Sequence, residues 1–279
     1  MSIQAWDAID PVIDAAIAED VGAGDITSQA LIPVDARYHG TLRARETMVA
    51  AGLDVAERLF FKIEPACTFE AKATDGDQLE KGDILAEVRG PARGLLTAER
   101  TALNFLQHLS GIATLTRSYA ELIDGTNAVL LDTRKTTPGL RILEKYATRM
   151  GGATNHRMRL DDAVLIKDNH IAVSGSIEEA VKRARAAGLT SIEVECDTLD
   201  QVEQAVTAGA DIIMFDNMNT EQLKQGVALV GSKAKTEASG GVTFETIRAI
   251  AETGVDTVSV GRITQSAPAV DIGLDWALE

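Results

Sequence analysis

The sequence predicts an α/β protein in two parts, an N-terminal α+β domain followed by a parallel sheet wrapped by helices. In the C-terminal half, short β-branched apolar runs alternate with helical patterns and are joined by short connections, which is typical of strand–helix units. The ends of three of these strands, at Glu195, Asp216 and Glu237, recur every 21 residues. This regular spacing favours a closed barrel over an open sheet, although the pattern alone leaves both open.

The N-terminal third has a different pattern, because helical and strand-like segments are mixed and do not alternate regularly. The expected elements are an amphipathic helix over residues 1–20, strands over 38–48 and 84–88, and helices over 53–61 and 95–109. We place a domain boundary near Ser110-Gly111, which gives an N-terminal domain over 1–111 and a barrel over 112–268. The tail, 269–279, is expected to pack back on the N-terminal domain.

The strands predicted for the second domain are short. They cover 128–131, 163–166, 192–194, 211–215, 234–237 (the weakest) and 257–260. Ser176 with Glu179, and Thr198 with Gln201, have the spacing of capping boxes, so a helix is expected to begin at each pair.

Charge and composition exclude several classes of partner. The formal net charge is −15 over 279 residues, which argues against a nucleic acid or an anionic membrane surface as partner. No apolar run approaches the roughly 18 residues of a membrane-spanning helix, and the acidic, amphipathic first helix does not resemble a signal peptide. Cys67 and Cys196 lie far apart, without metal-ligand spacing. We expect both to be reduced packing residues of a cytoplasmic protein.

One segment reverses the overall charge. Between residues 134 and 170 there are eight basic residues and four acidic ones. The basic residues are Arg134, Lys135, Arg141, Lys145, Arg149, Arg157, Arg159 and Lys167. In an acidic protein, such a cluster suggests a small polyanionic ligand, although a solvated basic helix face would look the same.

Polar residues follow almost every predicted strand of the second domain. In a barrel they would meet at the C-terminal rim, where such folds carry their chemistry. Ser239-Gly240-Gly241 and Val260-Gly261-Arg262 follow the last two strands, where backbone N–H groups often bind phosphate. The carboxylates of Glu195 and Asp216 suit ribose hydroxyls or Mg²⁺, a cation that prefers oxygen ligands.

The cations fit the same kind of ligand. Arg100, Arg134 and Arg157 can each bind a carboxylate with two hydrogen bonds, and Lys135 and Lys167 can act as point charges for phosphate. His156 alone is as readily structural as functional. The sequence contains no P-loop, no dinucleotide fingerprint, no zinc motif and no nucleophile elbow.

Several motifs together resemble the quinolinate phosphoribosyltransferases over nearly the whole chain. In the N-terminal domain they are EDVGAGDITS (19–28) and LTAERTALNF (96–105). In the second domain they are LDTRKTTPG (131–139), NHR (155–157), LIKDNHI (165–171), EVE (193–195), FDNM (215–218) and EASGG (237–241). Arg262 and Gln265 depart from the pattern of many relatives, which have a small residue and a histidine there.

The resemblance implies a fold, an activity and a role for each motif. The fold would be an open α/β sandwich followed by an incomplete barrel of about seven strands. The activity would be transfer of phosphoribose from phosphoribosyl pyrophosphate to quinolinate, giving nicotinate mononucleotide, CO₂ and pyrophosphate in de novo NAD biosynthesis. Mg²⁺ would be the cofactor. The active sites would be shared within a homodimer or larger homo-oligomer.

By the same resemblance, the cations would bind quinolinate, with Arg100 reaching into the partner subunit's barrel. The residues expected to bind quinolinate are Arg100, Arg134, His156, Arg157 and Lys167, and Thr133 and Lys135 would complete this binding strip. Lys135 and Lys167 would lie near the pyrophosphate, and Glu195 and Asp216 would hold the ribose hydroxyls and Mg²⁺. The 5′-phosphate would lie on 239–241 and 260–262. Lys135, Glu195 and Asp216 are the residues expected to act in catalysis.

Two other functions remain open. A nicotinate-type phosphoribosyltransferase would act on a monocarboxylate and would need fewer cations than this chain carries. A non-catalytic barrel that binds a phosphoribosyl ligand could dispense with the acidic pair Glu195 and Asp216. The full set of cations and acids favours catalysis on quinolinate over both.

Overall fold

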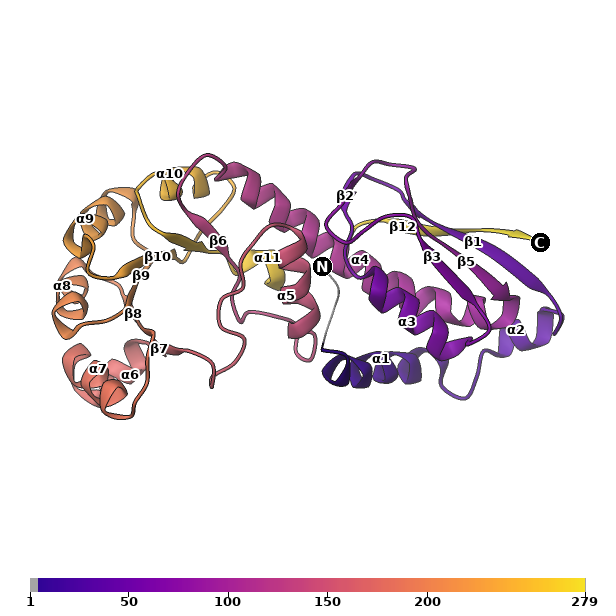
Figure 1. Cartoon of the computed structure of the whole chain (residues 1–279), viewed down its shortest axis with the longest axis horizontal. Helices are drawn as coiled ribbons and strands as arrows, with labels where there is room; N and C mark the ends of the chain where they lie inside the picture. Colours follow the sequence, from indigo (N-terminus) through magenta and orange to yellow (C-terminus); the bar gives the residue numbers. More distant parts are fainter. Residues whose placement is uncertain (1–4, 279) are drawn as a thin grey trace. The chain divides into compact units, whose positions relative to one another are not determined.

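The computed structural model describes residues 5–278, which form two compact units (Figure 1). Within the described residues, the first comprises 5–117, 136–152 and 263–278, and the second comprises 118–135 and 153–262. Neither unit is contiguous in the sequence. Residues 1–4 of the predicted first helix and Glu279 of the predicted tail lie outside the described residues.

The first unit is built on a four-stranded antiparallel sheet with the order β12-β1-β5-β3. These strands are β1 (Arg37–Ala44), β3 (Thr68–Ala71), β5 (Ile84–Pro91) and β12 (Ile272–Leu278). β12 runs antiparallel to β1, with Ala44 opposite Ile272 at one end of the register. The tail therefore supplies an edge strand of this sheet.

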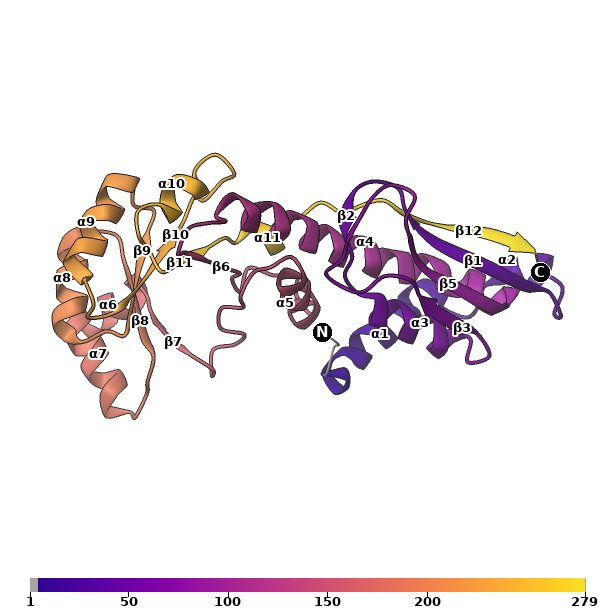
Figure 2. The same cartoon turned by 45° about the horizontal axis from the view of Figure 1, so that its top comes forward.

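Helices pack against the sheet and make the core of the first unit (Figure 2). Its other elements are α1 (Trp6–Val21), α2 (Ile26–Leu31), β2 (Met48–Val49), α3 (Leu53–Ile63), β4 (Gln78–Leu79), α4 (Ala92–Leu122) and α5 (Arg141–Met150). α3 shows why such a helix forms: Ala56, Leu59 and Phe60 share one face at helical spacing and are fully buried. Burying each large side chain contributes about 1.5–3 kcal/mol.

The long helix α4 does not end where the sequence predicted. It was expected to end near Leu109, but it continues to Leu122, so the boundary placed near Ser110-Gly111 lies inside a helix. Gly111 has a different role there. A Cβ at this position would lie 2.0 Å from the carbonyl oxygen of Pro268, so the glycine permits a close approach of two backbones.

The second unit contains a six-stranded parallel sheet with the order β6-β11-β10-β9-β8-β7. The strands are β6 (Val129–Leu131), β7 (Val164–Ile166), β8 (Ile192–Cys196), β9 (Ile212–Asp216), β10 (Lys235–Ser239) and β11 (Thr257–Ser259). The first strand lies beside the last, which is the arrangement of a barrel. Between β6 and β7, the described residues form only the parallel bridge Leu131–Thr154. The predicted incomplete α/β barrel is confirmed, with six strands and one bridge in place of a seventh strand.

Helices alternate with these strands and lie outside the sheet (Figure 1). They are α6 (Asp168–Ser174), α7 (Ile177–Ala186), α8 (Leu199–Ala208), α9 (Thr220–Val230) and α10 (Ile247–Ala251). The short helix α11 (Arg262–Gln265) follows β11, and its residues from Ile263 onward belong to the first unit. The predicted helix starts are confirmed. Ser176 accepts a hydrogen bond from the Glu179 N–H, and Thr198 and Gln201 form a reciprocal capping box.

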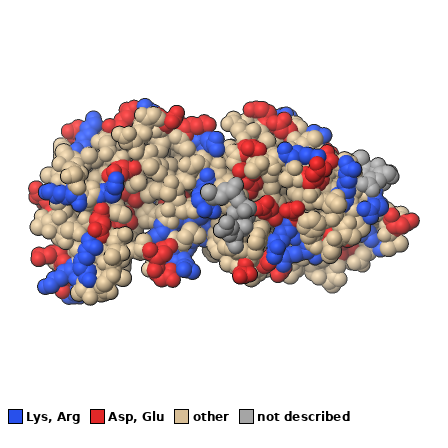
Figure 3. All heavy atoms as spheres, in the orientation of Figure 1, with Lys and Arg blue, Asp and Glu red and all other residues tan. Residues whose placement is uncertain are grey.

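The cysteines are free and buried, as expected, and burial raises the pKa of Cys67 to about 11 and of Cys196 to about 12. Within residues 5–278, no helix is both long enough and apolar enough to cross a membrane. On the face that Figure 3 shows, Lys and Arg are intermixed with Asp and Glu.

Candidate active site

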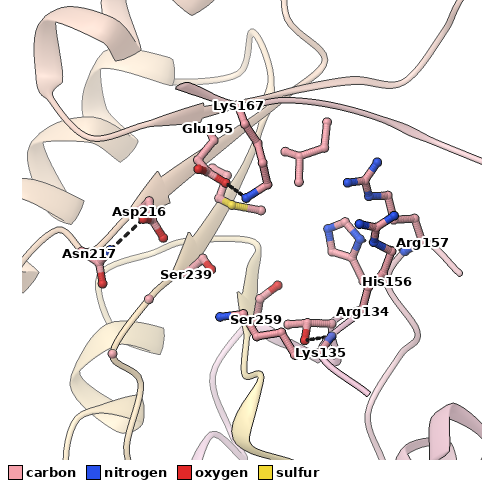
Figure 4. Close-up of a pocket in the computed structure, with 15 residues that line it drawn as sticks. Arg134, Lys135, His156, Arg157, Lys167, Glu195, Asp216, Asn217, Ser239 and Ser259 are labelled. Carbon is pink, nitrogen blue, oxygen red and sulfur yellow. Dashed lines mark hydrogen bonds and ion pairs between the residues drawn. The ribbon is translucent and has the colours of Figure 1, made fainter. Parts of the chain in front are cut away.

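A cavity of about 430 Å³ lies in the barrel unit, lined by residues at the C-terminal ends of its strands (Figure 4). The lining residues are Thr133, Arg134, Lys135, His156, Arg157, Leu165, Lys167, Glu195, Met214, Asp216, Asn217, Ser239, Gly240, Gly241 and Ser259. In Figure 4, Arg134, His156 and Arg157 lie on one side, and Glu195, Asp216 and Asn217 lie on the other. The cavity thus has a cationic wall and an acidic wall.

The cationic wall is held in place by a buried carboxylate. Asp132, which is fully buried at the end of β6, accepts hydrogen bonds from Asn155 Nδ2 (2.6 Å) and from the His156 backbone N–H (2.9 Å). This places Arg157 next to Arg134 in the cavity. Burial and the charge of Arg134 lower the pKa of Arg157. Two crowded cations favour binding of an anion with more than one negative group.

The acidic wall is formed by carboxylates from neighbouring strands. Glu195 Oε2 accepts from Lys167 Nζ at 2.5 Å, and Asp216 Oδ2 accepts from Asn217 Nδ2 at 2.7 Å. Burial raises the pKa of Asp216, and the negative charges of Glu195 and Asp197 raise it further, against Lys167 and Lys135. Crowded carboxylate oxygens on one side of a cavity are a donor set that fits a hard divalent cation.

A tight pair of turns closes the acidic side. Gly240 has a φ of +86°, and a Cβ there would lie 2.2 Å from Asn217 Oδ1. Asn217 itself has a φ of +55°, and its N–H donates to the Ser239 carbonyl at 2.9 Å. Strained backbone of this kind is concentrated at functional sites. Here it brings the glycine-rich turn against the acidic wall.

His156 lines the cavity, but both of its ring nitrogens face protein groups. Nε2 lies 3.3 Å from Glu193 Oε2 and 3.5 Å from Glu237 Oε2, and Nδ1 accepts from the Arg157 backbone N–H at 2.7 Å. Burial lowers the pKa of His156 and hydrogen bonds to the two carboxylates raise it, whereas the Arg157 N–H opposes protonation of Nδ1, because it donates to the lone pair that a second ring proton would occupy. A second ring proton on Nδ1 would displace the Arg157 N–H, so in this arrangement the hydrogen lies on Nε2.

The comparisons with known proteins agree with this geometry. Residues 25–110 match the family model described as quinolinate phosphoribosyl transferase, N-terminal domain, and residues 112–275 match the model of its C-terminal domain. The chain belongs to the quinolinate phosphoribosyl transferase family. The predicted resemblance is therefore confirmed.

Individual relatives cover nearly the whole chain. The probable nicotinate-nucleotide pyrophosphorylase (carboxylating) of Bacillus subtilis is 45% identical over 93% of this chain and 90% of its own length. The nicotinate-nucleotide pyrophosphorylase (carboxylating) of Mycobacterium leprae is 42% identical, over 97% and 98%. The crystal structure of NadC from Streptococcus pyogenes matches with a TM-score of 0.96 and 41% identity over all of both chains. Human nicotinic acid phosphoribosyltransferase, at 13% identity and a TM-score of 0.62, shares the fold.

The structure brings most of the predicted site residues of this family member into the cavity. They are Thr133, Arg134, Lys135, His156, Arg157, Lys167, Glu195, Asp216, Ser239, Gly240 and Gly241. Among the described residues, Val260, Gly261, Arg262 and Arg100 do not line it. Val260 is buried, Arg262 is exposed where α11 begins, and Arg100 is exposed on α4 in the first unit.

Four lining residues were absent from the predicted set: Leu165, Met214, Asn217 and Ser259. A signal for two of them was present in the sequence. Side chains two apart on a strand point the same way, so Leu165 shares a face with Lys167, and Met214 shares one with Asp216. Applying this alternation one step back from each strand end would have found both.

Proposed function

We propose that the chain transfers the phosphoribosyl group of phosphoribosyl pyrophosphate to quinolinate with decarboxylation, forming nicotinate mononucleotide, CO₂ and pyrophosphate. The observation that carries the proposal is the two-sided cavity, in which Arg134, Arg157 and Lys167 lie in one small volume with an acidic pair and a glycine-rich turn. Quinolinate has two carboxylates, and the other substrate has a 5′-phosphate, a pyrophosphate and a ribose. Each has a chemically matching wall.

The cationic wall would bind the dicarboxylate. Arg134 and Arg157 can each donate two charge-assisted hydrogen bonds to a carboxylate, and Lys167 adds a third positive charge. Held in this way, the pyridine nitrogen faces the ribose carbon C1, so positioning supplies much of the rate enhancement. Arg157 is already partly desolvated by burial, which strengthens its attraction for an anion.

The opposite wall would hold the sugar phosphate. Backbone N–H groups of 239–241 would bind the 5′-phosphate, and Glu195 and Asp216 would accept from the ribose hydroxyls. Lys135, exposed at the end of the β6 turn, would contact the pyrophosphate. We infer that Glu195 and Asp216 also hold Mg²⁺, directly or through water, since their carboxylates are the crowded oxygen donors of the cavity. A bound Mg²⁺ would offset the charge of the pyrophosphate group.

The reaction then needs no protein nucleophile. The bond from C1 to the pyrophosphate oxygen breaks as the bond from the pyridine nitrogen to C1 forms, and the electron pair leaves with pyrophosphate. In the quaternary pyridinium product, the bond from C2 to its carboxylate breaks and CO₂ leaves. The electron pair stays on C2 beside the positive nitrogen and takes up a proton from water. Fixed charges in a small cavity are what such a reaction requires.

A steady-state assay with two acceptors tests this proposal. The purified chain is incubated with phosphoribosyl pyrophosphate and Mg²⁺ and either quinolinate or nicotinate, and nucleotide is followed by chromatography. Turnover with quinolinate alone is expected. Turnover with nicotinate alone would assign the sibling activity, and phosphoribosyl pyrophosphate binding without turnover would assign a binding protein.

We also infer a homodimer or larger homo-oligomer with shared active sites, in a cytoplasmic protein whose thiols stay reduced. Arg100 is an exposed arginine outside the cavity, in a sequence motif shared with the family. If Arg100 serves the partner's site, mixing Arg100→Ala with Arg134→Ala subunits creates hybrid dimers with one intact site. Subunit exchange should then restore activity to about a quarter of wild type. No gain on mixing would contradict the sharing.

A further inference from the structure

Below the substrate cavity, the barrel interior contains a buried layer of polar side chains. Its members are Glu193, Glu237, Ser259 and the ring of His156. Glu193 and Glu237 are only 3% and 2% exposed. Barrel interiors are usually filled with branched apolar side chains at such positions, because buried carboxylates are costly to desolvate. This layer therefore calls for an explanation beyond packing.

The layer lies one step below the cavity on the same strand faces. Glu193 precedes Glu195 by two residues on β8, and Glu237 precedes Ser239 by two residues on β10. Glu195 and Ser239 line the substrate cavity. Glu193 and Glu237 instead line a second cavity of about 470 Å³, and His156 and Arg157 line both. The buried carboxylates thus face His156 from the side away from the substrate.

The contacts run in a continuous line from the carboxylates to the cationic wall. Ser259 Oγ donates to Glu237 Oε1, and the Oε2 atoms of Glu193 and Glu237 both lie within 3.5 Å of His156 Nε2. On the other edge of the ring, Nδ1 accepts from the Arg157 backbone N–H at 2.7 Å. Carboxylates at Nε2 require a hydrogen there, and the Arg157 N–H at Nδ1 requires a lone pair there, so the two contacts together select the neutral Nε2–H ring. The tautomer of one ring therefore depends on groups that never meet the substrate.

We propose that Glu193 and Glu237 are positioning residues that fix His156 in its Nε2–H tautomer, so that Nδ1 holds the Arg157 backbone and aims its guanidinium at the substrate's carboxylate. This inference rests on the proposed function for the identity of the carboxylate. The inference goes beyond the proposed function because it assigns His156 a role that acts through Arg157. Side chains that hydrogen-bond to a ligand-binding residue, without touching the ligand themselves, commonly set its orientation.

Ring ¹⁵N chemical shifts of His156 test the tautomer in the ligand-free wild-type protein. The chain has four histidines, so labelled histidine gives few signals, and the spectrum of His156→Gln assigns the one in question. A hydrogen on Nε2 and an unprotonated Nδ1 are expected at neutral pH. A hydrogen on Nδ1 would overturn the proposal, whatever substrate the protein uses.

Kinetics of Glu237→Gln and Glu237→Leu test the consequence. The leucine removes an acceptor, and the glutamine keeps an oxygen that can face Nε2. Misplacing a substrate-binding group by about 1 Å can cost on the order of 100-fold. We expect the KM for quinolinate to rise at least about tenfold in Glu237→Leu and less in Glu237→Gln, with the KM for phosphoribosyl pyrophosphate unchanged. At position 193 we likewise expect the KM for quinolinate to rise more in Glu193→Leu than in Glu193→Gln. This second pair of variants provides the test if Glu237→Leu does not fold.

A matched control separates positioning from general damage to the strand. Thr236 precedes Glu237, is equally buried, and bonds to Asp256 on the other face of β10. Thr236→Val should lower the melting temperature and leave both KM values near wild type. An unchanged quinolinate KM in a folded leucine variant, or an equal rise in both KM values, would overturn the proposal. A wild-type protein that keeps the Nε2–H tautomer but does not turn over quinolinate would instead refute the proposed function.

Discussion

Glu193 and Glu195 lie on the same face of β8, two residues apart, and have different surroundings. Glu195 lines the open cavity, and its Oε2 pairs with Lys167, whose side chain is 45% exposed. Glu193 is 3% exposed, faces His156, and leaves Oε1 without a hydrogen-bond partner among the described residues. In the proposed roles, the same type of side chain serves substrate binding at the rim and positions His156 one layer below. Distance from the strand end separates the two roles.

Removing a cation from the rim should have the largest effect. Arg134→Ala is expected to lower kcat/KM for quinolinate by about 100- to 1000-fold, since truncating one partner of a desolvated charge pair costs several kcal/mol. Steady-state kinetics measure it, and Arg183→Ala is the control. Arg183 is an exposed arginine in an i,i+4 pair with Glu179 on α7, and its loss should leave activity unchanged. Wild-type kinetics in Arg134→Ala would show that the cationic wall does not bind quinolinate.

Alanine substitutions at Glu193 and at Glu195 test directly whether the buried layer and the rim differ in this way. Glu193→Ala should lower the free energy of unfolding by about 3 kcal/mol, because it leaves a cavity in place of a buried side chain and removes one acceptor of His156 Nε2–H. Glu195→Ala should change it by about 1 kcal/mol or less, since its partner is half exposed, and should abolish most turnover. Urea unfolding and steady-state assays of both variants provide the test. Equal losses of stability would show that the layers do not differ as described.

A glycine pair tests the turn that closes the acidic wall. Gly240→Ala introduces a Cβ 2.2 Å from Asn217 Oδ1, and local strain of about 1–3 kcal/mol should raise the KM for phosphoribosyl pyrophosphate several-fold. Gly209→Ala is the control. Gly209 has a similar φ of +79° at the end of α8, but a Cβ there meets nothing within 4 Å. If both variants lose stability equally and keep the same KM, the turn does not shape the phosphate site.

The smallest effect is expected from relieving charge crowding at the rim. Because the pKa of Asp216 is raised in the folded state, the folded protein binds this proton more tightly than the unfolded chain, so stability falls as pH rises through that pKa. At neutral pH the ionised Asp216 therefore costs stability. Asp216→Asn should slightly raise the melting temperature of the ligand-free protein, as calorimetry can measure. A lower melting temperature at neutral pH would contradict the assigned crowding.

Much of this site could be predicted from the sequence, because each polar motif follows a strand whose apolar pattern is clear. Lys167, Glu195 and Asp216 were found in this way, and the structure brings them into one cavity. The buried layer was harder to predict. Glu193 lies within a predicted strand, and Glu237 was predicted as the end of one, although β10 continues to Ser239. Only the barrel's closure brings both to His156.

The end of α4 was missed for a related reason. Ser110-Gly111 looks like a domain boundary locally, but α4 continues through it to Leu122, and Gly111 packs there against the Pro268 carbonyl, from a segment 157 residues later in the chain. Such long-range contacts override a local breaker signal. Arg100 illustrates the same limit, since its expected partner would be another subunit, which neither the sequence pattern nor one chain contains.

The stoichiometry of the products is the most direct test of the proposed decarboxylating transfer. The chain is incubated with carboxyl-labelled quinolinate, phosphoribosyl pyrophosphate and Mg²⁺, and nucleotide, CO₂ and pyrophosphate are measured together, with and without a chelator. We expect the three products in equal amounts, and we expect all three to be lost when the metal is removed. Nucleotide formed without CO₂, or no product from quinolinate under any of these conditions, would contradict the proposed transfer.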